Sequence, residues 1–183
     1  MPEELKDLKG YKEIAIDLET NDPGLIELGS GNVVGRGHIA GIAVAVEGWS
    51  GYFPIHHEQG GNLDRALVLG WIQEIFKQED TTFIFHNAMY DVCWLRSAGI
   101  TIKGKIVDTM IAASLIDENR MSYQLNALAK HYVGIGKDEN VLNAAAKEYG
   151  LDPKLSPQNK LCLDPVSMAA ENAVFVLRCR IRR

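Results

Sequence analysis

Residues 11–20, YKEIAIDLET, alternate between apolar and polar positions with a period of two, which is typical of a β-strand. The apolar positions face one way, and Asp17 and Glu19 both face the other way. Two neighbouring carboxylates repel each other and are costly to bury. Such a strand therefore lies at a solvated edge or holds a cation, and we favour a divalent metal.

The pattern continues as an ordered series of short elements. Further strands are predicted at residues 38–46, 52–55, 82–85 and 105–107. Helices are predicted at residues 62–78 (capped by Asn62), 88–97, 109–116, 122–132, 140–149 and from 164 to the end. Residues 21–37 are rich in Gly, Asn and Pro and are expected to form a loop, as are His56 and His57. Pro54 indicates an edge strand.

This order of elements predicts an α/β fold with a mixed five-stranded sheet, three antiparallel strands followed by parallel ones, flanked by helices. The 183 residues suit one domain, residues 1–183, in which residues 1–10 form a poorly ordered polar tail. The basic end, RCRIRR, stops abruptly, so the chain is expected to be part of something longer.

The composition says more about the cellular compartment of the protein than about any reaction it catalyses. Three cysteines without a CxxC pair indicate neither a disulfide framework nor a zinc site, and they favour the cytoplasm. No apolar run is long enough to span a bilayer, so no membrane partner is expected. The net charge of -5 shows no general basic footprint, but a small metal-centred cleft can still bind the end of a nucleic-acid strand.

A second acidic position follows the fourth predicted strand, in FHNAMYD at residues 85–91. Asn87 is expected to cap the next helix, and Asp91 lies in its first turn, where the helix dipole alone is enough to explain an acid. However, ligands gather at the carboxyl ends of strands in such sheets. Together, Asp17, Glu19 and Asp91 would place three hard oxygen ligands at one edge, suited to Mg²⁺ or Mn²⁺.

Four segments in order, IDLET, FHNAMYD, VDTMIAASLI and AAENAVFVLR, resemble the exonuclease motifs of family A (DNA polymerase I-like) DNA polymerases. The Gly-rich stretch at residues 22–37, followed by IAGIAVAV and GYFPI, is most similar to the bacteriophage members. The resemblance implies an RNase H-like fold and a two-metal 3′→5′ exonuclease used for proofreading. It also implies a single-stranded DNA 3′ end as substrate, a nucleoside monophosphate as product and a DNA polymerase domain or subunit as partner, in the host cytoplasm if phage-encoded.

The resemblance carries over residue by residue. The first three acidic metal ligands of the family match Asp17, Glu19 and Asp91. The positions that contact or orient the 3′-terminal nucleotide match Thr20, Asn87 and Tyr90. Asp108 matches a recurrent acid that we assign to supporting structure. Leu18 or Tyr90 is expected to wedge or stack against the frayed terminal base.

The last motif departs from the family pattern. Met168 stands where the family has Tyr, and Asn172 stands where it has the fourth acidic ligand. Their spacing of four keeps both on one helical face, with Met168 beside the substrate and Asn172 in the catalytic set. Glu171 points about 100° around the helix and is a poor substitute. A neutral amide predicts a weaker second metal and reduced activity, partly rescued by Mn²⁺.

Three functions remain open on these residues. The first is a metal-dependent 3′→5′ exonuclease with reduced activity. The second is a catalytically inactive nuclease fold that binds nucleic-acid 3′ ends or supports a polymerase, and the identity of residue 172 separates it from the first. The third is an RNase H-like nuclease that trims RNA, against which the phage-like insert argues.

Overall fold

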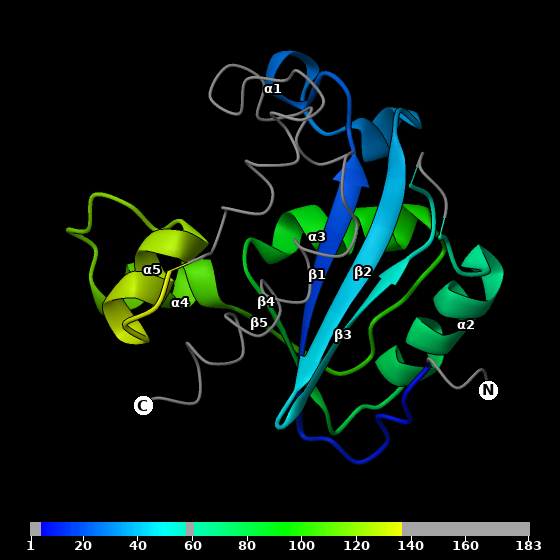
Figure 1. The fold of residues 1–183 in the computed structure, drawn as a ribbon. Helices are drawn as coiled ribbons and strands as arrows, with labels where there is room; N and C mark the ends of the chain where they lie inside the picture. The colour runs from blue at the N-terminus through cyan, green and yellow to red at the C-terminus, as the bar shows by residue number, and fades with distance from the viewer. Residues whose placement is uncertain (1–4, 58–60, 137–183) are drawn as a thin grey trace.

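The computed structural model describes residues 5–57 and 61–136. Their centre is one five-stranded sheet with the strand order β3-β2-β1-β4-β5. The strands are β1 Glu13–Asn21, β2 His38–Val46, β3 Trp49–Pro54, β4 Thr82–Phe85 and β5 Lys105–Asp108. β1 runs through the middle of the sheet, with β2 and β3 on one side of it (Figure 1).

The strand directions confirm the predicted mixed sheet. β1 pairs with β2, and β2 with β3, in antiparallel register, whereas β4 runs parallel to both β1 and β5. Pro54 ends the edge strand β3, where a missing N–H does no harm to the ladder. β4 pairs with β1 only at Glu13, Ile14 and Ala15, so the second half of β1 extends beyond β4.

Within the described residues, four longer helices alternate with the last strands or follow them. They are α2 Arg65–Phe76, α3 Ala88–Ser97, α4 Thr109–Ile116 and α5 Leu125–Tyr132. Two of them begin later than predicted. α2 is capped by Asp64, whose side chain accepts a hydrogen bond from the Leu67 N–H, and not by Asn62. α5 begins at Leu125, with Gln124 at the N-cap. Among the described residues, no helix is long and apolar enough to cross a membrane.

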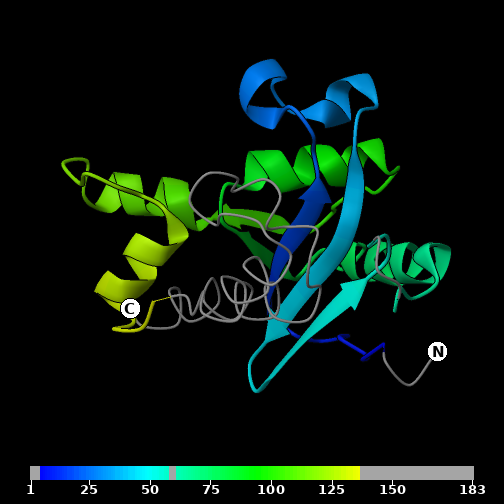
Figure 2. The same ribbon diagram turned by 45° about the horizontal axis from the view of Figure 1, so that its top comes forward.

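The segment predicted to be a loop at residues 21–37 contains two short helical turns, α1 Leu25–Leu28 and the 3₁₀ helix η1 Gly31–Val34. Both lie beyond the C-terminal end of β1 in the two views of Figures 1 and 2. Gly24, with φ 82°, stands before α1 in the left-handed region that favours glycine. The abundant glycines therefore shape tight helical turns here instead of an irregular loop.

The alternation of β1 divides the interior between the two sheet faces. Ile14, Ile16 and Leu18 pack with α2 and α3 in the larger core, which also takes in Trp71 and Trp94. Ala15 lies on the other face, in a smaller cluster that includes residues of α5. The acids predicted to share a face with Ala15 therefore point away from the larger core.

The N-terminal residues differ from the predicted tail. Leu5 and Leu8 are buried in the larger core, and the Trp71 Nε1–H donates to the Lys6 carbonyl at 3.0 Å. Residues 5–10 are therefore part of the packed fold, because two leucines of an otherwise polar stretch cover the apolar side of α2. The predicted helices at residues 140–149 and from 164, with Met168 and Asn172, lie outside the described residues.

Candidate active site

The acidic pair lies on the half of β1 that extends beyond β4. Asp17 pairs with Ala43 and Glu19 with Gly41 across the β1–β2 ladder. A register shift follows directly between Glu19 and Thr20, and such bulges commonly adjoin functional sites, where they redirect side chains. Glu19 is buried, with 8% of its surface exposed. Two buried or half-buried acids on one strand face require a partner that offsets their charge.

Asp91 joins this pair from α3. Its carboxylate is 3% exposed, and its Oδ1 accepts a 3.1 Å hydrogen bond from the backbone N–H of Leu18, between the two acids of β1. Burial raises the pKa of Asp91 well above its ordinary value, and the charge of Asp17, then of Glu19, raises it further, against the opposing effect of the Leu18 hydrogen bond. The structure thus brings the three predicted acids within electrostatic reach of one another.

The chemistry of these oxygen donors suits a divalent cation. In residues 5–57 and 61–136, however, no three His, Cys, Asp or Glu side chains come together in an arrangement ready to hold a metal. The fourth predicted position, Asn172, lies outside the described residues. The acids fit a cation in type and charge, and the complete ligand set remains a prediction.

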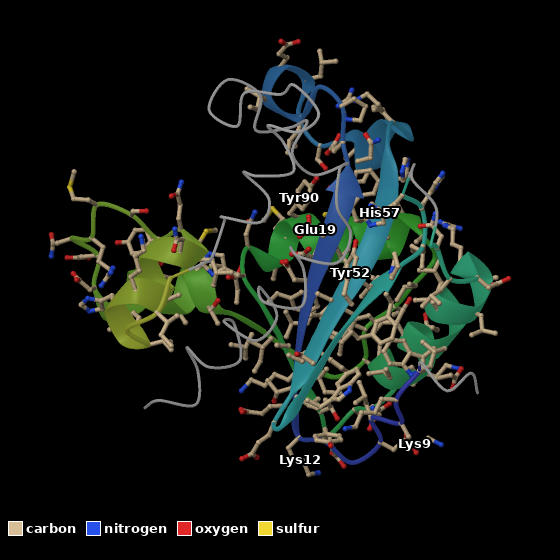
Figure 3. The ribbon with its side chains drawn as sticks, viewed as in Figure 1. Lys9, Lys12, Glu19, Tyr52, His57 and Tyr90 are labelled. Carbon is tan, nitrogen blue, oxygen red and sulfur yellow. The ribbon has the colours of Figure 1, made fainter. Side chains whose placement is uncertain are left out.

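Thr20 and Tyr90, both predicted to contact the terminal nucleotide, contact each other. Tyr90 Oη lies 2.7 Å from Thr20 Oγ1 and donates to Asp22 Oδ2 at 3.1 Å. Because the single phenolic proton goes to Asp22, the Thr20 hydroxyl donates to Tyr90. Asp22 also accepts the Gly31 N–H with both oxygens. This network, which links β1, α3 and η1, fixes the half-buried Tyr90 ring at the edge of the acids (Figure 3).

Leu18 is placed differently from the prediction. Its side chain is 6% exposed and packs in the larger core, on the sheet face opposite Asp17 and Glu19. The expected contact of Leu18 with a terminal base is therefore wrong as a side-chain contact, because strand alternation turns that side chain inward. Its backbone N–H, which binds Asp91, is the part of Leu18 that contributes to the site.

Asn87 stands at the N-cap of α3, as predicted, but its side chain makes no capping hydrogen bond. Its backbone is left-handed, with φ 67°, a conformation that Asn tolerates better than most residues. The Asn87 and Ala88 N–H groups donate instead to the Asp108 carboxylate, at 3.1 and 2.8 Å. Asp108 also caps α4. This agrees with the supporting role assigned to it, and leaves the Asn87 side chain exposed.

Three residues near the acids were missed by the sequence analysis: Asp22, Tyr52 and His57. His57 was expected in a surface loop, yet it is 6% exposed and its Nε2 bonds to the phenol of Tyr52. Burial, then the charge of Glu19 and of Asp17, raises the pKa of Tyr52. The signal available in the sequence was the strand register, since antiparallel pairing places Tyr52 in line with Asp17.

Comparisons with known proteins identify the family of the chain. Residues 2–178 match the model of the 3′-5′ exonuclease family that occurs in family A DNA polymerases. The chain belongs to that family. It is 41% identical over 152 residues to a DNA-directed DNA polymerase of Pseudomonas phage M6, covering 80% of this chain and 23% of the polymerase. It is 28% identical over 156 residues to DNA polymerase I of Pseudomonas aeruginosa, covering 81% of this chain and 16% of that protein.

Solved structures of other proteins share the fold of this family member. The structure of Trypanosoma brucei RNase D aligns with a TM-score of 0.63 at 16% identity, covering 94% of this chain and 57% of that one. Brucella melitensis NrnC bound to pGG aligns with a TM-score of 0.62 at 16% identity, covering 97% and 75%. These matches confirm the RNase H-like fold. The chain spans under a quarter of the length of the Pseudomonas phage M6 and Pseudomonas aeruginosa polymerases.

Proposed function

We propose that this exonuclease-family chain hydrolyses the terminal phosphodiester of single-stranded DNA in the 3′→5′ direction, as proofreading requires. The observation that carries the proposal is the Asp91 carboxylate, which is buried, bound to the backbone of β1 and surrounded by the charge of Asp17 and Glu19. Burying like charges together is unfavourable unless a cation offsets them. In an exonuclease-family fold, the cation is best explained as part of the reaction centre.

Asp17, Glu19 and Asp91 are the residues that would hold Mg²⁺ or Mn²⁺. Two such ions, when bound, would neutralise charge on the scissile phosphate and lower the pKa of a water, so that it can attack the phosphate as hydroxide. Asn172 stands at the fourth acidic position of the family motif and could offer only a neutral amide oxygen, so we expect one of the two ions to bind weakly. The protein itself contributes rigid placement of the acids, because one of them is fixed to the main chain of the strand that carries the other two.

Thr20, Asn87, Tyr90 and Met168 are the side chains proposed to contact the 3′-terminal nucleotide. Support comes from the hydrogen-bonded Thr20–Tyr90 pair, which presents a rigid aromatic ring beside the acids. Stacking on such a ring is tolerant of base identity, as removal of any mismatched nucleotide demands. The products are a nucleoside monophosphate and a shortened strand. Similarity to polymerases of phage and bacteria supports a polymerase domain or subunit as the partner.

A second candidate function is a nuclease fold that binds 3′ ends without cutting them. The observation that favours it is the pair Met168 and Asn172. Met168 lacks the hydrogen-bond donor of the phenol in the family motif, and Asn172 lacks the negative charge of the carboxylate. Without the negative charge of a fourth carboxylate, the second metal ion is expected to bind more weakly.

One experiment separates the two. The purified chain is incubated with 5′-labelled single-stranded DNA, and in parallel with RNA, in Mg²⁺ or Mn²⁺, alongside an Asn172→Asp variant and an Asp17→Asn control. A ladder of products shortened from the 3′ end, faint in Mg²⁺, stronger in Mn²⁺ and strongest in the variant, supports an impaired exonuclease. Intact DNA in every lane, with retained binding in a filter assay, supports the binding role. Shortening of RNA but not of DNA would show that the chain is an RNA-trimming nuclease.

A further inference from the structure

Tyr52, on the edge strand β3, lies in line with the acids of β1. Across the three antiparallel strands, Asp17 pairs with Ala43 and Ala43 pairs with Tyr52. Cross-strand partners point to the same face of a sheet, so the Tyr52 ring shares the face of the acids. The two views of the ribbon place β3 beside β2, and Figure 3 shows Tyr52 and Glu19 close together on this part of the sheet.

A glycine lets the Tyr52 ring reach toward Glu19. Gly41, on the intervening strand, is the direct partner of Glu19. A Cβ atom at position 41 would lie 2.0 Å from Tyr52 Oη and 2.3 Å from its Cζ, so the end of the ring occupies the space that any other side chain at position 41 would fill. The phenol therefore crosses β2 at the row that contains Glu19. This placement agrees with the raised pKa of Tyr52, to which burial contributes most, Glu19 next and Asp17 after it.

The phenol is held from its other side by His57. His57 Nε2 is in hydrogen-bond contact with Tyr52 Oη, and the two rings meet edge to face at 5.8 Å between their centroids. His57 is itself fixed, because its N–H donates to Asn62 Oδ1 at 2.7 Å and its carbonyl accepts from Asn62 Nδ2 at 2.8 Å. With the proton on Nε2, His57 donates to the phenol oxygen and leaves the phenol proton available for an acceptor on the acidic side.

We propose that Tyr52, held by His57, is a positioning residue for the Glu19 carboxylate, and that it orients this acid for cation binding. The inference rests on the proposed exonuclease site. Its chemical basis is that a hydrogen bond to one carboxylate oxygen fixes the rotation of the group and leaves the other oxygen directed at the ion. Partners of this kind around metal ligands typically change metal affinity about 10–100-fold when they are removed.

The test measures Mn²⁺ binding to the purified chain by calorimetry or by the electron paramagnetic resonance of free Mn²⁺, which needs no nuclease activity. Tyr52→Phe keeps the ring and removes only the oxygen. We expect about 10-fold weaker Mn²⁺ binding in this variant, with little change in the urea midpoint measured in EDTA. The matched control is Tyr123→Phe, which removes a phenol that donates to the Asp117 carbonyl in an exposed position, and it should bind Mn²⁺ as the unaltered chain does.

Two further variants approach the same phenol from its neighbours. His57→Phe removes the buttress, and the double variant with Tyr52→Phe should lose no more Mn²⁺ affinity than Tyr52→Phe alone, because both act through one interaction. Gly41→Ala displaces the end of the ring without altering Tyr52 and should also weaken Mn²⁺ binding. Its control is Gly70→Ala on α2, where an added Cβ has nothing within 4 Å.

The outcomes are distinct. Equal Mn²⁺ affinity in Tyr52→Phe and the unaltered chain overturns the positioning role, as does a loss of folding stability without a loss of Mn²⁺ affinity. Mn²⁺ binding by the unaltered chain that depends on Tyr52, without cleavage of DNA even by Asn172→Asp, overturns the exonuclease proposal but supports the positioning role. Absence of Mn²⁺ binding in the unaltered chain overturns both.

Discussion

The backbone N–H of Leu18 donates a 3.1 Å hydrogen bond to Asp91 Oδ1, joining positions 73 residues apart in the chain. This bond anchors the acid of α3 to the strand residue that separates Asp17 from Glu19. Because β4 stops pairing with β1 at Ala15, the later part of that strand edge is open to a helical side chain. The Asp91 carboxylate is therefore held against the main chain of the strand that carries the other two acids.

Asp91→Asn should separate stability from activity. The amide oxygen can still accept the Leu18 N–H, while the charge that meets Asp17 and Glu19 is gone. Without metal, we expect the variant to be more stable than the unaltered chain by about 1 kcal/mol, or about 2–4 °C in melting temperature for a chain of this size. With metal, we expect its cleavage rate to fall at least about 100-fold, which is more than the loss of a residue that only hydrogen-bonds to a metal ligand would cause. Thermal melts in EDTA and a gel assay measure both.

The control for that substitution is Asp117→Asn, the same exchange at an exposed carboxylate that also accepts a backbone N–H, that of Asn119. It should alter neither melting temperature nor cleavage. A metal-free Asp91→Asn chain that melts below the unaltered one would show that the carboxylate stabilises the apo fold, contrary to the repulsion inferred here.

Stability without metal should fall as the pH rises. The folded-state pKa of Asp91 is raised above its ordinary value of 3.8, so the folded state keeps this proton more tightly than the unfolded state. The stabilising contribution is complete below pH 3.8 and is lost as the pH rises through the raised pKa. Urea unfolding in EDTA at several pH values should show this decline in the difference between the unaltered chain and Asp91→Asn. Adding Mg²⁺ should reduce the decline, and a flat difference would contradict it.

Asp108→Ala should destabilise the chain more than an ordinary loss of a helix cap. Asp108 accepts from Met110 and Ile111 at the start of α4, and also from Asn87 and Ala88 at the start of α3. Losing one cap costs about 1 kcal/mol, so we expect about 2–3 kcal/mol here, because N–H groups at the starts of two helices lose their acceptor. Urea denaturation provides the measurement.

Asp64→Ala is the matched control, because Asp64 caps α2 with a single hydrogen bond to the Leu67 N–H. Its cost should be about 1 kcal/mol. Equal costs for the two substitutions would mean that Asp108 serves only as a cap of α4 and does not hold the turn before α3.

The alternation of apolar and polar residues predicted the sheet well, because the burial of a strand's side chains follows the same period of two as the sequence. It placed Asp17 and Glu19 on the face away from Ile14 and Ile16, as the two cores confirm. The same rule turns the Leu18 side chain into the larger core, because Leu18 alternates with Asp17 and Glu19.

Side-chain contacts between residues far apart in the chain were harder to predict from the sequence. The capping of α3 by Asp108 rather than Asn87 depends on how two consecutive strand–helix turns lie beside each other, which no local pattern encodes. The burial of His57 depends on its bond to Tyr52 and on Asn62. The prediction that Asn62 caps α2 was wrong, because Asp64 caps that helix and Asn62 binds the backbone of His57 in the preceding loop.

Tyr90→Phe should weaken DNA binding more than catalysis. Tyr90 Oη bonds to Thr20 at 2.7 Å and donates to Asp22 at 3.1 Å, so the phenol ties the ring to β1 and to the residue that follows it, which in turn binds the first residue of η1. Each bond is worth about 1 kcal/mol, and a ring that loses both should raise KM for single-stranded DNA about 5- to 10-fold with kcat little changed. Tyr11→Phe is the control, because Tyr11 packs against the same core before β1 begins. A fall in kcat with an unchanged KM would instead assign the Tyr90 hydroxyl to the chemical step.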